Sequence, residues 1–248
     1  MTFFNELAKA IQAYFNSLEF INQHKLWGYF IIPAILNLLV FIAVGVIAFY
    51  SAGELIYYFS DLTDLDTSNE AVAFGQMLLA VLIRIIVFLI YLKLYRYFIL
   101  ILLAPVLALM AEKLFELKNE SSVPFKFSRF ISNAARGIKI AFSNLLKEIA
   151  LTLIILIMVI LLPIISPFAP LVIFLIEGYY YGFSMIDYFN ELKGMKADES
   201  RGFIWEHKGL ALGNGTLFSL LLLIPFIGVL IVPSLSLVAA HLSLEETV

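Results

Sequence analysis

The chain has no cysteine among its 248 residues. Disulfides, thiolate metal sites and thiol nucleophiles are therefore excluded. Its three histidines lack metal-ligand spacing, and the sequence contains no zinc-protease, serine-hydrolase or nucleotide-binding motif. Glu177, Asp187 and Glu191 form a candidate acidic cluster, but no nucleophile motif accompanies them. We expect no metal, no other cofactor and no enzymatic activity.

Charged residues are also scarce. They make up 14% of the chain, compared with about 25% in typical soluble domains. Hydrophobic residues make up 62%, and there is no basic tail that would indicate nucleic-acid binding. This composition predicts an all-α integral membrane protein, folded as a single membrane domain over residues 1–248, with the lipid bilayer as its first partner.

The segment from Leu26 to Gly53 contains no charged residue, and the rest of the chain is organised around it. It is longer than the roughly 20 apolar residues that a helix needs to cross a bilayer, so we predict the first transmembrane helix over residues 26–53. Pro33 lies near the start, where a helix tolerates proline. Residues 1–25 place apolar side chains at helical spacing, which predicts an amphipathic helix in the membrane interface or on the bundle.

Residues 54–70 contain Asp61, Asp64 and Asp66 but no Lys or Arg. Because cytoplasmic loops carry the excess of basic residues, we place this segment outside and the N-terminus inside. The aspartates do not follow the order of an EF-hand calcium loop. A solvated acidic loop is therefore the preferred interpretation.

The second transmembrane helix and its kinked extension are predicted over residues 71–111. Two registers are open. A span that starts at the first of these residues buries one cation, Arg84, whereas a span over residues 85–110 buries two, Lys93 and Arg96. A cation in mid-bilayer costs roughly 2.5 to 3.5 kcal/mol on insertion scales, so we favour the first register. The second requires a water-filled cavity around both charges.

Basic residues gather in two later segments, residues 112–148 and residues 187–209. We expect a basic cytoplasmic helix in the first and a cytoplasmic connector in the second, with both termini in the cytoplasm. Attraction to anionic lipid is the simplest explanation for the charge of the first segment.

Two apolar segments, residues 149–186 and residues 210–248, are interrupted by prolines near their middle. The prolines are Pro163, Pro167 and Pro170 in the first segment and Pro225 and Pro233 in the second. Each half is roughly 21 to 24 Å of helix, shorter than the ~30 Å hydrocarbon core. We favour two re-entrant hairpins that turn at the prolines, although a double crossing by short helices gives the same sidedness. A re-entrant tip must be buried in protein or face water, which favours an oligomer.

Several short motifs follow one another along the chain. They are the run from Phe30 to Leu39, Ala104-Pro105 followed by Ala111-Glu112-Lys113, then Asp187-Tyr188, and Ile224-Pro225-Phe226-Ile227 with Pro233. Together they resemble the CysZ-type sulfate permease family of bacterial inner membranes. The resemblance implies two long transmembrane helices, two hemi-membrane hairpins, a homo-oligomer, and passage of sulfate toward cysteine biosynthesis.

The chain departs from that family where the family binds sulfate. The family has a Gly-Leu/Ile-Arg-Arg-like stretch just before its first span, whereas this chain has His24-Lys25-Leu26-Trp27-Gly28. Arginine offers a planar fork that matches an oxyanion, while lysine is a point charge. The family also has a proline after the Asp-Tyr pair, where this chain has Phe189-Asn190. The resemblance to the family therefore supports the implied fold of this chain more strongly than the implied sulfate ligand.

Five residues are candidates for anion binding or an anion pathway: His24, Lys25, Arg84, Ser166 and Ser234. Arg84 is an intramembrane charge, and such charges are usually functional. The two serines lie where the returning hairpin helices begin, and free N–H groups at helix starts attract anions. Each has a structural alternative: an ion pair between Arg84 and Glu177, helix capping at the serines, or a membrane-surface anchor at the first two residues.

We therefore expect an inner-membrane permease or channel for sulfate or a similar small oxyanion. It would be driven by the solute gradient, because the chain carries no ATPase motif. The alternative is a non-transporting scaffold, lipid-binding protein or assembly protein of the same fold, which the missing arginine pair favours.

Overall fold

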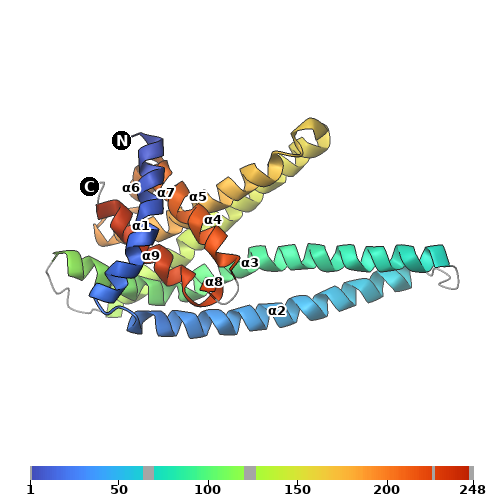
Figure 1. The fold of residues 1–248 in the computed structure, drawn as a ribbon, viewed down its shortest axis with the longest axis horizontal. Helices are drawn as coiled ribbons and strands as arrows, with labels where there is room; N and C mark the ends of the chain where they lie inside the picture. Colours follow the sequence, from blue (N-terminus) through green and yellow to red (C-terminus); the bar gives the residue numbers. More distant parts are fainter. Residues whose placement is uncertain (1, 64–69, 120–126, 225–226, 246–248) are drawn as a thin grey trace. The chain divides into compact units, whose positions relative to one another are not determined.

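The computed structural model describes residues 2–63, 70–119, 127–224 and 227–245 of the chain. In these ranges the chain is helical apart from short turns and contains no strand. The elements are α1 (Phe3–Gln23), α2 (Gly28–Thr63), α3 (Glu70–Asn119), α4 (Phe127–Leu161), the 3-10 turn η1 (Pro163–Ile165), α5 (Ala169–Leu192), α6 (Ala197–Glu206), α7 (Lys208–Leu222), α8 (Ile227–Leu230) and α9 (Val232–Glu245) (Figure 1). The prediction of an all-α protein is confirmed.

Four helical segments in the described ranges are long and apolar enough to cross a bilayer. They are Gly28–Tyr58, Phe98–Lys118, Phe127–Leu161 and Ala169–Leu192, and a shorter apolar helix covers Val72–Phe88. Many large apolar side chains on these segments are exposed, including Ile160 and Phe49, which are 77% and 78% exposed. Such surfaces are stable only against lipid or another protein.

The end of α2 does not coincide with the end of the uncharged run. The helix continues past Gly53 and Glu54 to Thr63, so the segment predicted as a loop over residues 54–70 begins as helix. Hydrogen bonds within a helix are local, and a charged side chain does not interrupt them. The charge pattern therefore marks where a membrane span can end, not where the helix ends. Asp64 and Asp66 lie outside the described residues.

The basic segment over residues 112–148 is likewise divided between two long helices. α3 continues through Pro105 and includes residues 112–119. α4 starts at Phe127 and passes residue 148 into the first apolar arm without a break. The predicted cytoplasmic helix is thus the end of one long helix and the start of the next, for the same reason as in α2.

The chain divides into two compact units. Unit 1 comprises Met1–Asn37 and Leu100–Val248, and unit 2 comprises Leu38–Ile99. In unit 1, α5 packs on α7 and α4, while α1 packs on α7 and α9. Unit 2 is a pair of antiparallel helices formed by parts of α2 and α3.

Glycine allows α5 and α7 to touch backbone to backbone. A Cβ atom on Gly182 would lie 1.8 Å from the carbonyl oxygen of Ala211, and one on Gly215 would lie 1.7 Å from that of Gly178. Glycines four residues apart on α5 and small residues four apart on α7 lie on facing surfaces, an arrangement common where helices pack within membranes. This contact sets the spacing at the centre of unit 1.

Polar side chains connect α1 to the same centre. The Tyr14 hydroxyl donates to the carbonyl oxygen of Asn214 at 2.8 Å. The Ser236 hydroxyl donates to Asn214 Oδ1 at 2.6 Å, and Asn214 Nδ2 donates to the Ser236 carbonyl at 3.2 Å. All three residues are buried, so these bonds fix how α1, α7 and α9 pack together.

The two proline-containing hairpins of unit 1 differ in burial. In the first, α4 and α5 extend away from the rest of unit 1, and the turn between them exposes Ile164 and Phe168 (Figure 1). In the second, the returning helix α9 is packed inside unit 1, and Val232 and Leu237 to Ala240 are fully buried. The first hairpin therefore presents its arm and tip for contact with lipid or a partner, whereas the returning helix of the second does not.

In unit 2, aromatic residues set the register between the two helices. The Tyr91 hydroxyl donates to the carbonyl oxygen of Phe41 at 3.2 Å, and the ring of Tyr95 lies 5.2 Å from that of Phe41. A Cβ atom on Gly45 would lie 3.6 Å from the Tyr91 hydroxyl oxygen. Because the two helices are antiparallel, each residue further back along α3 lies beside one further along α2. This pairing puts Arg84 level with Ala52.

Candidate functional site

The turn between α1 and α2 contains the first two predicted anion-binding residues. Lys25 has φ 54°, in the left-handed region, and this reverses the chain between the helices. His24 Nδ1 lies 3.0 Å from the Phe20 carbonyl oxygen, and Trp27 Nε1 donates to Asn22 Oδ1 at 2.7 Å. The turn is thus held by contacts on both sides of Lys25, whose side chain is exposed.

This turn is suited to attracting an anion. It lies directly before the N-terminus of α2, where the helix dipole is positive, while the N–H groups of Tyr29 and Phe30 already donate to the carbonyl oxygens of Leu26 and Trp27. The Lys25 ammonium adds a full positive charge at the same place. An oxyanion there would meet both, but without the bidentate fork that an arginine provides.

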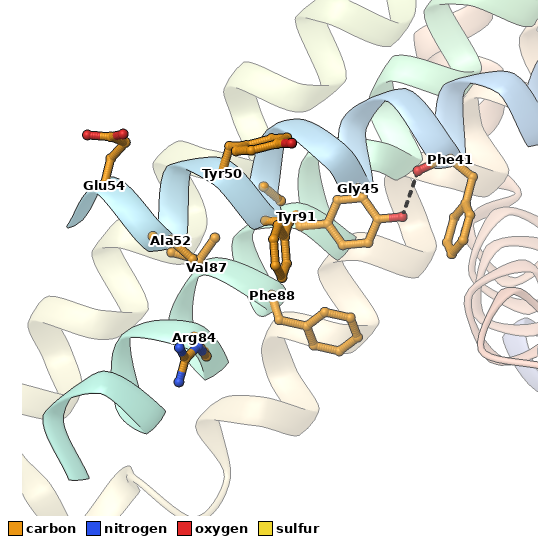
Figure 2. A pocket seen from close by; sticks show the side chains of 12 residues that line it. Phe41, Gly45, Tyr50, Ala52, Glu54, Arg84, Val87, Phe88 and Tyr91 are labelled. Carbon is orange, nitrogen blue, oxygen red and sulfur yellow. Dashed lines mark hydrogen bonds between the residues drawn. The ribbon is translucent and has the colours of Figure 1, made fainter. Parts of the chain in front are cut away.

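Arg84, the third candidate, lies in unit 2 and lines a pocket of about 590 Å³ between α2 and α3. Figure 2 shows Arg84 and Glu54 at the same end of this pocket as Ala52, with Phe41 toward the other end. Because Glu54 ends the uncharged run of α2, Arg84 lies level with the edge of that run rather than its middle.

The two serines occupy unlike environments. Ser166 is exposed in the turn after η1, at the tip of the first hairpin. Ser234 is fully buried inside unit 1, and among the described residues its hydroxyl has no hydrogen-bond partner. Sequence periodicity cannot distinguish an apolar run that faces lipid from one that faces protein, so the difference was not foreseen.

The candidates do not form one cluster within either unit. His24, Lys25, Ser166 and Ser234 belong to unit 1, and Arg84 belongs to unit 2. Glu177, the predicted partner of Arg84, is in unit 1, so that ion pair stays a prediction.

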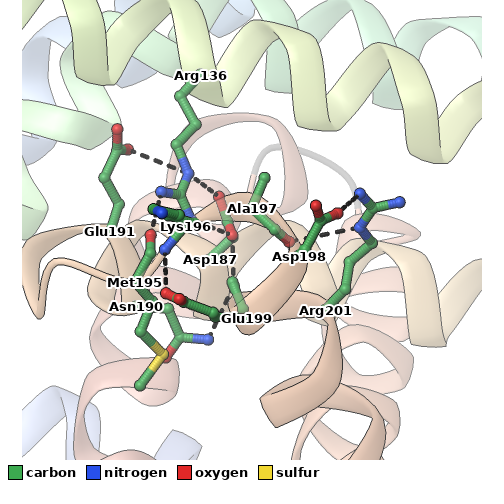
Figure 3. A network of polar contacts seen from close by, with 11 residues as sticks. Arg136, Asp187, Asn190, Glu191, Met195, Lys196, Ala197, Asp198, Glu199 and Arg201 are labelled. Atoms are coloured by element: carbon green, nitrogen blue, oxygen red, sulfur yellow. Dashed lines mark hydrogen bonds and ion pairs between the residues drawn. The ribbon is translucent and has the colours of Figure 1, made fainter.

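A polar network that sequence reasoning missed connects α4, α5 and α6 (Figure 3). Arg136 on α4 makes a bidentate contact with Asp187 on α5: Nε donates to Oδ2 at 3.1 Å and Nη2 donates to Oδ1 at 2.9 Å. Arg136 Nη1 also donates to the carbonyl oxygen of Met195 at 2.5 Å. The side chains of Arg136 and Asp187 are only 17% and 3% exposed, so the pair is largely removed from water.

Asp187 is also held from α6. The Ser200 hydroxyl donates to Asp187 Oδ1 at 2.6 Å, and Asn190 Nδ2 donates to the Ser200 oxygen at 3.0 Å. Glu191, one helical turn after Asp187, has Oε2 3.9 Å from Arg136 Nε. The carboxyl groups of Asp187 and Glu191 thus both contact the guanidinium of Arg136. Arg136 therefore connects the helices and is not available to bind an anion.

The same region extends to α3. Asn133 Nδ2 donates to Glu112 Oε1 at 3.1 Å. These two residues, Arg129 and Glu191 line a pocket of about 170 Å³. The sequence signal for this region was the spacing of Asp187 and Glu191, which puts two carboxylates on one helix face, but nothing in the sequence indicated which cation they would meet.

A family model described as "Sulfate transporter CysZ/Etoposide-induced protein 2.4" matches residues 13–233. The chain belongs to this family. The matched range contains the α1–α2 turn, Arg84, both hairpin turns and the Arg136 network. No curated protein shows a significant match to the chain.

Membership in the CysZ/EI24 family, together with the four apolar helices, makes this a membrane protein of a transporter family. The resemblance seen in the sequence motifs is therefore confirmed at the level of the family.

Proposed function

We propose that this protein lets sulfate or a similar small oxyanion cross the bacterial inner membrane down its gradient and toward cysteine biosynthesis. The observation that carries the proposal is the family match over residues 13–233, whose description names a sulfate transporter. The α1–α2 turn supports it, because Lys25 is held at the N-terminus of α2, where the resemblance to the family implies an anion-binding stretch.

His24 and Lys25 are the proposed first contact for the anion. Arg84, Ser166 and Ser234 remain predicted parts of the pathway. Since this stretch has Lys25 and His24 but lacks the arginine pair that the resemblance implies, we expect weak and salt-sensitive binding of the oxyanion.

We propose that the first hairpin is re-entrant and enters from the cytoplasm, where both termini lie. The apolar arm of α4 after residue 148 is about 20 Å long, shorter than the ~30 Å hydrocarbon core. Its exposed tip includes the polar Ser166 and backbone groups of the turn, which need protein or water around them. A homo-oligomer that surrounds these tips would supply protein contacts and water to these polar groups, and would form the passage for the anion.

For the second transmembrane span we propose the register that starts near Ile85, in place of the register from residue 71 that the cost of burying two cations favours. The exposed apolar side chains of Phe74, Met77 and Leu82 would then need protein contacts in a homo-oligomer. The aromatic pairing of unit 2 puts Arg84 level with the edge of the uncharged run of α2, which supports a place for Arg84 at the membrane boundary. This register requires a water-filled cavity around two cations within the span, which fits a passage for an anion.

One observation favours the second candidate function, a non-transporting lipid-binding protein. The pocket of unit 2 is large, and most of its lining side chains are apolar or aromatic. A lipid-binding role would not require the missing arginine pair.

The test is sulfate uptake into liposomes by the wild-type protein and by Lys25→Gln, with Lys139→Gln as a control. Lys139 is an exposed lysine on α4, away from the α1–α2 turn in sequence. If Lys25 contacts the anion, its loss removes a charge-assisted contact and should raise the sulfate concentration for half-maximal uptake about tenfold. The control should match wild type. Equal uptake by all three proteins would show that Lys25 has no part in binding.

A further inference from the structure

Arg84 carries an exposed positive charge on α3 in unit 2. Among the described residues of unit 2 its guanidinium makes no hydrogen bond or ion pair. Charged groups of membrane segments are normally paired, hydrated or in contact with lipid headgroups. The guanidinium therefore has its full set of donors available for an anion from outside the chain.

The space beside Arg84 is suited to a hydrocarbon chain. The pocket is hollow because small residues lie on one face of α2, at Gly45, Ala48 and Ala52. Aromatic rings, including those of Phe88 and Tyr91, line it from α3. Its volume of about 590 Å³ lies within the roughly 300 to 1,000 Å³ of typical ligand sites. A small inorganic oxyanion would meet Arg84 but would leave this apolar space empty.

The charges of Arg84 and Glu54 at one end of the pocket indicate which headgroup a bound lipid would carry. Arg84 and Glu54 line the same end of the pocket, with Arg84 on α3 and Glu54 on α2 (Figure 2). A phosphate matches the guanidinium in a bidentate geometry, and an ammonium group matches the carboxylate. A headgroup that carries both charges complements this rim, whereas a purely anionic headgroup would be repelled by Glu54.

We propose that the unit 2 pocket binds a zwitterionic phospholipid with an ammonium headgroup. Its phosphate lies on Arg84, its ammonium group near Glu54, and one acyl chain between α2 and α3. The depth agrees with this placement, because Glu54 ends the uncharged run of α2 and so marks the level at which headgroups lie. The proposal does not depend on sulfate transport.

Native mass spectrometry of the purified protein tests the proposal. The protein is offered equal amounts of phosphatidylethanolamine and phosphatidylglycerol in detergent, and the lipids retained per chain are counted. Wild type should retain mainly phosphatidylethanolamine. Arg84→Gln should retain about tenfold less, because a charge-assisted contact is lost, and Arg84→Lys should recover part of the binding. Glu54→Gln should abolish the preference for phosphatidylethanolamine.

A substitution in the pocket separates acyl-chain binding from headgroup contact. Ala48→Phe fills the hollow and should prevent retention, while Ala43→Phe, an exposed position of α2 outside the pocket lining, should retain lipid as wild type does. Circular dichroism and a single size-exclusion peak check that each variant is folded. Equal retention by wild type, Arg84→Gln and Ala48→Phe would overturn the proposal. So would preferential retention of phosphatidylglycerol, or a dimer that occupies the pocket and is lost in Ala48→Phe without any bound lipid.

Discussion

The contact between α5 and α7 leaves no room for a single methyl group. In Gly182→Ala the new Cβ would lie 1.8 Å from the Ala211 carbonyl oxygen and 2.7 Å from its carbonyl carbon. Because ordinary contacts of this kind begin near 3.4 Å, the helices must separate by roughly 1.5 Å. The clashing atoms belong to the backbone, so rotation of a side chain cannot relieve the clash.

The cost follows from how tightly the centre of unit 1 is packed. Overpacking usually costs about 1 to 3 kcal/mol, and a clash with rigid backbone lies at or above the upper end. A loss of about 3 kcal/mol lowers the midpoint of thermal unfolding by roughly 6 to 12 °C in a chain of this size. Separating α5 from α7 would also loosen α1, which contacts α7 through Gly209 and Gly213.

The assay is thermal unfolding of the detergent-solubilised protein, followed by circular dichroism. Gly202→Ala is the matched control, because Gly202 is helical and a Cβ there meets nothing within 4 Å. Alanine is the better helix former, so the control should melt at the wild-type temperature or slightly above it. If Gly182→Ala melts with the control, the close packing of α5 on α7 is wrong.

Two further predictions concern the joint at Arg136 and the membrane topology. Asp187→Asn should lower the free energy of unfolding by about 3 kcal/mol, because it breaks a mostly buried ion pair, whereas Asp198→Asn, which breaks the exposed pair with Arg201, should cost less than about 1 kcal/mol. Comparable losses in chemical denaturation of the two variants would contradict a special role for Asp187. Since the chain has no cysteine, single cysteines report cleanly on topology: a thiol in place of Ser166 should be shielded from an impermeant outside reagent, and one in place of Gly75 should be labelled. The reverse pattern would reject both the re-entrant hairpin and the proposed register.

Uncharged runs and prolines were sufficient to predict where the first long helix begins and where the first hairpin turns. The run after Lys25 becomes α2, and the prolines from Pro163 onward fall at the turn between α4 and α5. These features depend on hydrogen bonding within a segment and on the solvation of that segment, and both follow from the local sequence. Helix ends such as Thr63 were not predictable, because a helix can continue beyond the bilayer.

Contacts between helices were the part that the sequence did not reveal. Arg136 and Asp187 are 51 positions apart, and many charged residues of the basic segment were equally plausible partners. Ser234 was predicted where the returning helix of the second hairpin begins, but the sequence did not reveal that this helix, α9, is packed inside unit 1 with Ser234 buried. Choosing among such pairs of residues requires knowledge of how the helices of the whole unit pack, and hydrophobic periodicity does not give that information.

Passage of sulfate is tested by uptake of radiolabelled sulfate into liposomes that contain the purified wild-type protein. If the protein passes sulfate, uptake should be saturable and should follow the imposed sulfate gradient. Unlabelled sulfate should inhibit it, and chloride at the same concentration should not. Uptake no faster than in protein-free liposomes, from protein shown to be folded by circular dichroism, would contradict the proposed passage of sulfate.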